Sequence, residues 1–372
     1  MLWRVEEHEA LTERAWDEGL ARDEVGAIVA DAEAAESDGF WPGHPLDDVE
    51  EHERVCSLYL GSAGTIWGLW KLGSSLDCAG AVTAAIERYR AIPDFGSDAH
   101  PPSLWMGESG LLVVADKVGS PAADRGRLRR FVLENREHPT WELMWGSPGT
   151  MIAARACDLE DEWHDSATRL WASWDERSDV WTQDIYGQRR VFLGPAHGFA
   201  GNVHALRGYV SEDVLCARVT RLLERTAGRE DGWINWPPEG RPLSEFASTI
   251  RVQWCHGAPG IIATVGDLIP QRMAIGGGEL IWQAGPLRKG PGLCHGTAGN
   301  GFAFLKLHDR TGDPRWLDRA RCFAMHAIEQ VRRQKAVLGR GRYTLWTGDI
   351  GVALYLQACL DAQGAFPTID GF

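Results

Sequence analysis

A glycine pair with the spacing Gly-x-x-Gly recurs seven times along the 372-residue chain and constrains its fold more than any other feature. With 43 glycines, chance alone would give roughly five such pairs, so the prediction depends on the flanking residues. Six of the seven pairs follow an apolar or aromatic residue, and each pair precedes an apolar run of helical length. Such recurrence is typical of repeat architectures. The pairs are Gly61/Gly64, Gly107/Gly110, Gly146/Gly149, Gly198/Gly201, Gly257/Gly260, Gly296/Gly299 and Gly348/Gly351.

Charged stretches of helical length alternate with the glycine pairs, and their apolar residues recur every three to four positions, which predicts outer helices with one buried face. The runs after the glycine pairs are apolar nearly all round and are predicted to be inner helices. The sequence therefore predicts an all-α fold, an (α/α)7 toroid of seven inner and seven outer helices, as a single domain over 1–372 whose repeats begin near residue 50. The outer helices are expected at 9–36, 78–92, 122–137, 162–177, 212–226, 276–288 and 314–334.

Two local expectations follow from this arrangement. The stretch 181–192 is rich in β-branched and aromatic residues, which predicts a short hairpin or an ordered loop over the mouth of the central cavity. Inner helices that begin at one cavity would present free N–H groups and partial positive charge there, which favours thiolates, enolates or carboxylates.

Composition limits the classes of partner. The formal net charge of −14 argues against a nucleic-acid partner and is compatible with a cationic peptide substrate. No apolar stretch approaches the length of about 20 residues that spans a bilayer, and the acidic N-terminus resembles no secretory signal. We therefore expect a cytoplasmic protein without a membrane span, in which the eight cysteines are thiols or metal ligands.

Two of the eight cysteines occupy the same position of successive repeats. Cys255 and Cys294 each begin a Cys-His-Gly sequence, 39 residues apart. Together with His295 they form the three-ligand set of a catalytic zinc (Zn²⁺) site, whose fourth position stays open. The alternative is that both cysteines are small buried residues before glycine turns, which is the reading that suits the other six cysteines.

Two further histidines occupy the position of His295 in other repeats. His256 could be a fourth ligand, which would close the shell and make the site structural, or it could face the cavity as a proton donor. His197 follows Ala196 in place of a cysteine, so it need not bind metal and suits general acid or base work. Its alternative role is to cap a helix N-terminus.

Two charged residues lie in apolar surroundings close to these positions. Arg251, four residues before Cys255, could stabilise a developing oxyanion or simply face solvent. Glu142, in the lead-in to the third glycine pair, could orient a histidine or arginine or act only as a charge at a helix start.

These motifs resemble those of the lanthionine synthetase C family, and most closely its LanC-like branch. The resemblance lies in Cys-His-Gly-Ala-Pro-Gly at 255–260, Lys-Gly-Pro-Gly-Leu-Cys-His-Gly-Thr-Ala-Gly-Asn at 289–300, Gly-Pro-Ala-His-Gly at 194–198 and the seven glycine pairs. It implies a seven-fold α/α toroid, a zinc ion held by Cys255, Cys294 and His295, and the addition of a cysteine thiol to dehydroalanine or dehydrobutyrine to form a thioether.

The resemblance also implies roles for the other candidate residues. By position His197 matches the acid/base histidine of the family and Arg251 the arginine near the metal. His256 stands where peptide cyclases typically have tyrosine, and Glu142 where they have aspartate. Both departures indicate LanC-like relatives, which are associated with adding glutathione to dehydroamino acids in proteins.

The expected chemistry is a Michael addition. Zinc deprotonates the thiol, Arg251 and the helix N-termini stabilise the enolate, and His197 or His256 protonates the α-carbon. The sequence has no dehydratase-like part, so a dehydratase partner would have to make the alkene. Two alternatives stay open: a non-catalytic zinc scaffold that binds peptides, and a zinc prenyltransferase, which would need more basic residues near the site than Arg288 and Lys289.

Overall fold

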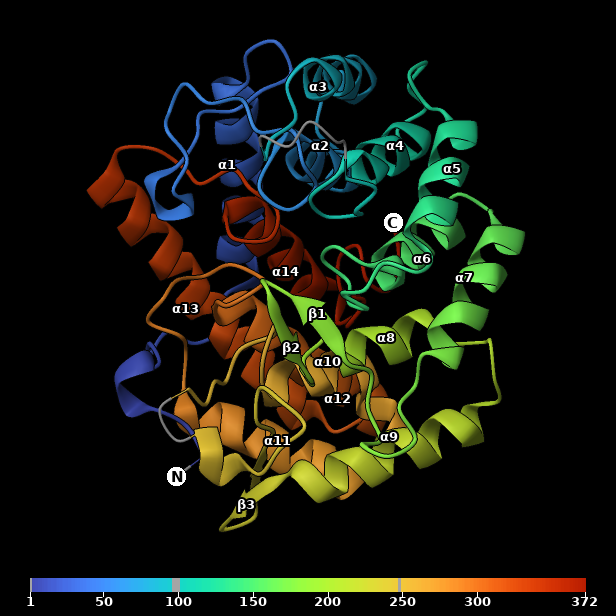
Figure 1. Ribbon diagram of the computed structural model, residues 1–372. Coiled ribbons are helices and arrows are strands. Elements are labelled where there is room, and N and C mark those ends of the chain that lie inside the picture. The colour runs from blue at the N-terminus through green and yellow to red at the C-terminus, as the bar shows by residue number, and fades with distance from the viewer. Residues whose placement is uncertain (1, 96–100, 247–248) are drawn as a thin grey trace.

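The chain folds into two concentric rings of helices in the computed structural model, which describes residues 2–95, 101–246 and 249–372 (Figure 1). The inner helices are α2 (Ser62–Lys71), α4 (Glu108–Lys117), α6 (Ser147–Ala156), α8 (Phe199–Ala205), α10 (Ala258–Val265), α12 (Thr297–Thr311) and α14 (Asp349–Asp361). The outer helices are α1 (Glu18–Ala35), α3 (Cys78–Ala91), α5 (Arg125–Asn135), α7 (Glu160–Ala172), α9 (Glu212–Thr226), α11 (Gln271–Ala284) and α13 (Pro314–Leu338). Short 3-10 helices lie at Val5–Glu7, Pro45–Asp47, Leu243–Phe246 and Gly266–Leu268.

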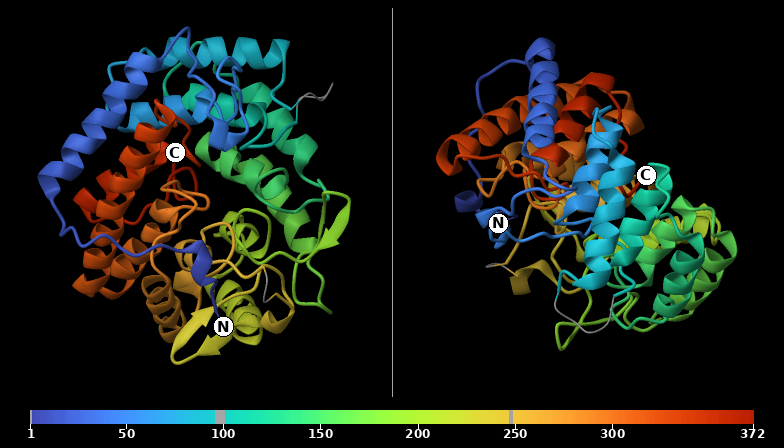
Figure 2. Two further views of the ribbon diagram at one scale, coloured as in Figure 1. Left: turned by 90° about the vertical axis from the view of Figure 1, so that its left-hand side faces the viewer. Right: turned by 90° about the horizontal axis from the view of Figure 1, so that it is seen from above.

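The inner ring is closed. Each inner helix contacts the next along the chain, and α14 contacts α2. The left panel of Figure 2 shows the outer helices arranged around the inner ones, with the C-terminal end of the chain inside the ring. The predicted all-α toroid is therefore confirmed, with helices inner and outer in the predicted order.

The main differences from the expected boundaries and elements are local. The first outer helix begins at Glu18 rather than near residue 9, where the Asp17 side chain accepts a hydrogen bond from the N–H of Leu20 and caps the helix. The hairpin expected within 181–192 is present as β1 (Gln183–Ile185) and β2 (Gln188–Arg190). A second hairpin, β3 (Gly228–Glu230) and β4 (Trp233–Asn235), was not predicted, although its Asp-Gly turn at 231–232 is a strong hairpin signal.

The glycine pairs allow each loop to pack directly against the helix that follows it. At the second glycine of every pair, a Cβ atom would lie 1.8–2.3 Å from the carbonyl oxygen six residues earlier, far inside van der Waals contact. Only glycine tolerates this approach of backbone to backbone. The contacts are Gly64 to Leu58, Gly110 to Leu104, Gly149 to Leu143, Gly201 to Pro195, Gly260 to Trp254, Gly299 to Leu293 and Gly351 to Leu345.

We expect Gly110→Ala to destabilise the fold by about 1–3 kcal/mol, because the new methyl group would overlap the Leu104 carbonyl and contact Leu58. Gly26→Ala is the matched control. Gly26 lies on the exposed face of α1, and a Cβ added there would have no atom within 4 Å. Alanine at this position should therefore increase the free energy of unfolding by up to about 1 kcal/mol. Urea denaturation measures both. Equal stabilities of the two variants would contradict this account of the glycine pairs.

The prediction of free N–H groups at the inner-helix starts is wrong for several helices. The first two N–H groups of α2, α8 and α12 donate to carbonyls seven residues earlier, for example Phe199 to Phe192 at 2.9 Å. The first N–H of α10 donates to Oδ1 of Asn235 at 2.8 Å. The loops that carry the glycine pairs thus satisfy these donors themselves, and anion binding at the ring centre depends on side chains.

An aromatic cluster fills the axis of the ring. Trp105, Trp254 and Trp346 lie with ring centroids 4.5–6.0 Å apart, and Phe366 stacks on Trp254 at 5.0 Å. All four are fully or almost fully buried. Trp254 directly precedes Cys255, so this rigid cluster supports the loop that carries the first candidate metal ligand.

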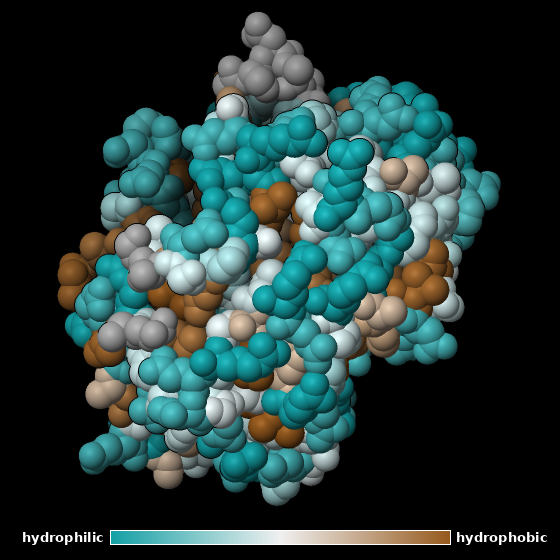
Figure 3. All heavy atoms as spheres, turned by 60° about the horizontal axis from the view of Figure 1, so that its bottom comes forward, coloured by the Kyte–Doolittle hydropathy of each residue, from teal (hydrophilic) through white to brown (hydrophobic). Residues whose placement is uncertain are grey.

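The face seen in Figure 3 is mainly hydrophilic, and its hydrophobic side chains gather in small separate patches rather than one broad area. Tyr186 in the β1–β2 turn is 71% exposed and is one of few large hydrophobic side chains on the described surface. No helix among the described residues is long and apolar enough to cross a bilayer.

Candidate functional site

The structure brings the two Cys-His-Gly turns together at the start of α10 and α12. The N–H of Cys255 donates to the carbonyl of Cys294 at 3.1 Å, which holds the two turns side by side. One ligand atom each from Cys255, Cys294 and His295 lie within 4.8 Å of one another, and all eight cysteines are free thiols. Residues 39 positions apart in the chain therefore meet as one cluster.

The donor set of this cluster fits zinc. Two thiols and an imidazole are the ligands that zinc prefers, and zinc–ligand bonds of about 2.0–2.3 Å place tetrahedral ligand atoms about 3.3–3.8 Å apart. The observed spread of at most 4.8 Å is compatible with that geometry after small side-chain adjustments. Both thiols are almost fully buried, whereas His295 is half-buried.

The hydrogen bond between the two thiols shifts their pKa values in opposite directions. A hydrogen bond from the Cys255 thiol lowers the pKa of Cys294 well below its ordinary value, against the effect of burial, and the charge of His295 acts in the same direction. The same hydrogen bond and burial raise the pKa of Cys255. Such a pair is poised to lose its protons when a cation binds.

Two residues that the sequence analysis did not single out contact the sulfur atoms. The Gln253 amide donates to Sγ of Cys255 at 2.9 Å, and the buried Tyr59 hydroxyl donates to Cys294 and helps to lower its pKa. Tyr59 occupies the position of Cys294 in the first repeat, two residues before the first glycine of its pair. Comparison of that position across all seven repeats would have found it.

Glycine is required at position 257, between the cluster and α10. Gly257 has φ 112°, and a Cβ there would lie 2.2 Å from the carbonyl oxygen of Arg251. A conformation of this kind is accessible essentially to glycine alone. The turn thereby directs Cys255 and His256 toward the ring centre.

Glu142 and His197 form the second part of the site. Nδ1 of His197 lies 3.0 Å from Oε2 of Glu142, and the fully buried carboxylate also accepts hydrogen bonds from the N–H groups of Met144 and Trp145. Burial alone would lower the pKa of His197, but the hydrogen bond to Glu142 and the Glu142 charge outweigh it, so the pKa is raised. With Nδ1 held by Glu142, Nε2 is the nitrogen free to exchange a proton.

His256 lies beside His197 rather than within the cysteine cluster. The two rings stack with centroids 6.0 Å apart, and Phe192 packs against His256 at 5.6 Å. Burial, followed by the charges of His197 and Arg251, lowers the pKa of His256 to about 3. Its Nδ1 is buried without a hydrogen-bond partner among the described residues. The geometry therefore leaves His256 outside the three-residue set and gives it a neutral ring.

Arg251 lies at the edge of the site and is not free. Its Nη1 forms an ion pair with Glu7 at 2.9 Å, and its side chain is 31% exposed. Glu7 belongs to the N-terminal segment, whose backbone also bonds to Arg288. Arg251 is nevertheless close enough to depress the pKa of His256. The negative charge of Glu7 partly offsets the positive charge of Arg251, so Arg251 would stabilise a developing oxyanion less than an unpaired arginine would.

The β1–β2 hairpin lies over the ends of α8 and α10 and borders this side of the site (Figure 1). The ring of Tyr186, at the hairpin tip, lies 6.3 Å from that of His197, and its hydroxyl lies 3.5 Å from Nε1 of Trp145. Two aromatic rings therefore lie close to His197, that of Tyr186 at the hairpin tip and that of Phe192 at 6.0 Å.

Comparisons with known proteins identify the family and support the fold. The family model described as lanthionine synthetase C-like protein matches residues 52–370. Among solved structures, nisin cyclase superposes with a TM-score of 0.52 at 16% identity, covering 94% of this chain and 99% of that chain. At this low identity the superposition supports the fold alone.

Two curated relatives match part of the chain. "Glutathione S-transferase LANCL1" of Danio rerio is 34% identical over 209 residues, which is 51% of this chain and 47% of that protein. "LanC-like protein GCL1" of Arabidopsis thaliana is 33% identical over 195 residues, or 48% and 43% of the two chains. The matched segments thus span less than half of these relatives. With the family model matching most of the chain and the toroid closed as predicted, the protein belongs to the lanthionine synthetase C-like family.

Proposed function

We propose that this protein is a zinc-dependent enzyme that adds a cysteine thiol to a dehydroalanine or dehydrobutyrine residue and so forms a thioether. The observation that carries the proposal is the pairing of two features at one ring centre: a Cys255, Cys294 and His295 cluster, and a histidine held by a buried carboxylate. The first suits thiol activation and the second suits proton transfer.

The metal would be held by Cys255, Cys294 and His295, with a fourth position for the substrate thiol. Zinc bound there would supply a Lewis acid that lowers the pKa of a thiol from its ordinary value of about 8.5 and so favours the thiolate at neutral pH. Gln253 and Tyr59 orient the two cysteine sulfurs by hydrogen bonds. Because His256 lies outside the cluster, the open three-ligand site is favoured over the closed shell of a zinc scaffold.

The remaining steps use residues of the chain itself. The substrate sulfur forms a bond to the alkene β-carbon, the π electrons move onto the carbonyl oxygen, and Arg251 offsets the developing charge. His197 then delivers the proton on its Nε2 to the α-carbon, while Glu142 holds Nδ1 and stabilises the imidazolium. We assign this proton transfer to His197 because Glu142 fixes its ring orientation, whereas no such partner holds His256.

The source of the thiol decides between two forms of the reaction. The partial match to a glutathione S-transferase, together with His256 and Glu142 at positions where peptide cyclases typically have tyrosine and aspartate, supports addition of glutathione to a dehydroamino acid in a peptide or protein. A ring-forming reaction within one peptide is the alternative. In either form we propose that a dehydratase partner supplies the alkene and that a reducing, cytoplasmic environment keeps the thiols free.

The test is a thiol-addition assay with zinc-loaded protein, glutathione and a dehydroalanine-containing peptide, followed by mass spectrometry. We expect a product heavier than the peptide by one glutathione, formed about 30-fold faster than by protein stripped with a chelator, because only a few per cent of a free thiol is ionised at neutral pH. A second peptide with an internal cysteine measures ring formation. Equal rates with and without zinc, for both peptides, would refute the proposal.

A further inference from the structure

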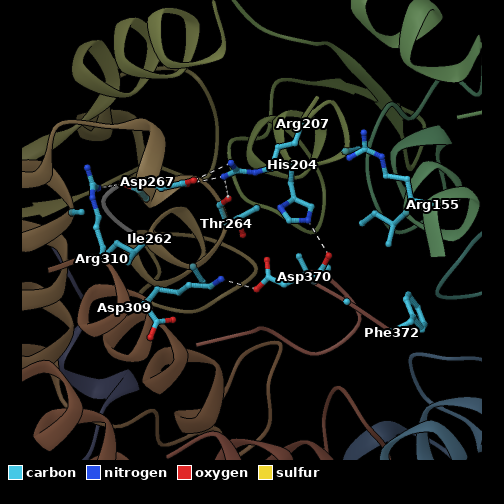
Figure 4. Close-up of a pocket in the computed structure, with 18 of the residues that line it drawn as sticks. Arg155, His204, Arg207, Ile262, Thr264, Asp267, Asp309, Arg310, Asp370 and Phe372 are labelled. Carbon is cyan, nitrogen blue, oxygen red and sulfur yellow. Dashed lines mark hydrogen bonds and ion pairs between the residues drawn. The ribbon is translucent and has the colours of Figure 1, made fainter. Parts of the chain in front are cut away.

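A large cavity lies at the opposite ends of the helices that carry the candidate site. Its volume is about 730 Å³, within the range of small-molecule sites. α8, α10 and α12 begin at the His197, Cys255 and Cys294 turns, and residues at their C-terminal ends, among them His204, Thr264 and Arg310, line the cavity (Figure 4). The cavity is therefore separated from the proposed thioether site by the length of the inner helices.

Most of the charged side chains that line this cavity already have partners. Arg207 pairs with Asp267 at 2.7 Å, and Lys306 pairs with Asp370 at 2.7 Å. Arg310 donates to the carbonyls of Gly266 and Ile269, where it caps the carbonyl ends of the helices. The polar atoms of these side chains already bond to other groups of the protein and offer few free partners to a ligand.

Arg155 is the exception. It stacks on the ring of Trp163 with Cζ 3.7 Å from the centroid, and it forms no ion pair among the residues that the structure describes. Stacking fixes the plane of the guanidinium and leaves its N–H groups available. Arg155 is an exposed residue of the lining. Partial desolvation lowers its pKa, and the charge of Glu160 acts in the opposite direction without an ion pair between the two side chains. The lining thus contains an oriented cation that a ligand can reach.

Two buried polar atoms of the same lining also have no partner within the described chain. Oγ1 of Thr264 is unbonded although Thr264 is only 3% exposed, and Nδ1 of His204 is unbonded while its Nε2 lies 2.9 Å from the carbonyl of Ile369. Leaving such atoms unpaired costs about 1–3 kcal/mol each. Both residues line the cavity, but these two atoms are themselves closed to solvent, so an occupant bonds to them only after the side chains rotate toward the cavity.

Asp309 also lines the cavity, where its carboxylate accepts a hydrogen bond from the N–H of Gly364, and most of the remaining lining is apolar. Met151, Ile152, Ile262, Leu307 and Phe372 contribute to it. Apolar walls with a few convergent polar groups are the usual composition of a small-molecule site. The combination indicates an amphipathic occupant that carries one negative charge.

We propose that this cavity is a second binding site, distinct from the thioether site, for a small carboxylic acid with an apolar body. The carboxylate contacts Arg155, the apolar body fills the space beside Ile152 and Ile262, and polar atoms of the ligand reach Thr264 and His204. The proposal does not depend on the proposed enzymatic activity, because none of these residues belongs to the candidate metal cluster or to the Glu142–His197 pair.

The test is isothermal titration calorimetry on the full chain with 2-naphthoate and 2-naphthamide, two probes of the same shape that differ in charge. We expect the naphthoate to bind at least tenfold more tightly than the amide. Arg155→Gln should weaken naphthoate binding about tenfold, or about 1.4 kcal/mol, and leave the amide unchanged. Ile152→Trp, which fills the cavity from its half-buried wall, should weaken both probes.

Two variants serve as controls. Arg218 stacks on Trp171 at the same 3.7 Å but lies outside the cavity lining, so Arg218→Gln should bind naphthoate like the unmodified chain. Cys294→Ala should also leave naphthoate binding intact. Absence of naphthoate binding, unchanged affinity in Arg155→Gln, or loss of binding in Cys294→Ala would each overturn the proposal, the last because the probe would then occupy the thioether site.

Discussion

Cys294→Ala is expected to lower the zinc content from about one ion per chain to near zero and to reduce thioether formation to the uncatalysed rate. Cys294 supplies one of the three clustered ligand atoms, and its sulfur is the one that both the Cys255 thiol and Tyr59 stabilise as an anion. With only Cys255 and His295 left, a zinc ion would lack a second thiolate. Metal analysis by mass spectrometry and the thiol-addition assay measure the two effects.

Cys157→Ala is the matched control, because Cys157 is also fully buried but lies at the end of α6, away from the cluster. It should keep its zinc and its activity and lose only the stability that follows from a small cavity. Circular dichroism should show the same helix content in both variants. A Cys294→Ala protein that retained zinc and full activity would contradict the proposed site.

His197→Asn is expected to reduce kcat by about 10²–10⁴-fold, the usual contribution of a positioned general acid. Asparagine can still donate a hydrogen bond toward Glu142, so the buried carboxylate keeps a partner, but it carries no exchangeable proton in the neutral range. Zinc content should not change, which separates this effect from that of Cys294→Ala.

Glu142→Gln should act through the pKa of His197. Glu142 raises that pKa, so the protonated form of His197 persists to higher pH in the native chain. Activity that needs this form falls as pH rises through the raised pKa, and in Glu142→Gln the fall should occur at lower pH. The Glu142–His197 contribution to stability has the same sign, present at low pH and lost as pH rises. Profiles of kcat/KM against pH test this, and unchanged profiles would rule out proton transfer by His197.

The order of inner and outer helices could be predicted from the sequence because every repeat contains its own local signals for one inner and one outer helix. Apolar runs after the glycine pairs and amphipathic stretches between them are local signals, and the closed ring satisfies both. The start of α1 was misplaced because residues 9–17 carry apolar side chains without forming a helix, and only the Asp17 cap marks the true beginning. The β3–β4 hairpin is absent from the prediction, although the Asp-Gly sequence at its turn favours a hairpin.

The site was predictable to the extent that it depends on repeat position. Cys255, Cys294 and His295 were expected to meet, and their ligand atoms do lie together. The pairing of Arg251 with Glu7 was not predictable, because 244 residues separate them and no periodicity relates the N-terminal segment to the ring. The loss of free N–H groups at the helix starts likewise depends on loop carbonyls that no pattern in the sequence reveals.

The second glycine of each pair packs against a carbonyl six residues earlier. The residues that hold the ring together are therefore different from the residues that face its centre. The second glycines pack against the backbone in the same way in all seven units, whatever side chains stand one and two residues before the pair. Tyr59, Ala196 and Cys255 occupy equivalent places in three of these units with very different chemistry. A scaffold of this kind can exchange its central residues one at a time during evolution, since each exchange leaves the contacts that hold the turn unchanged.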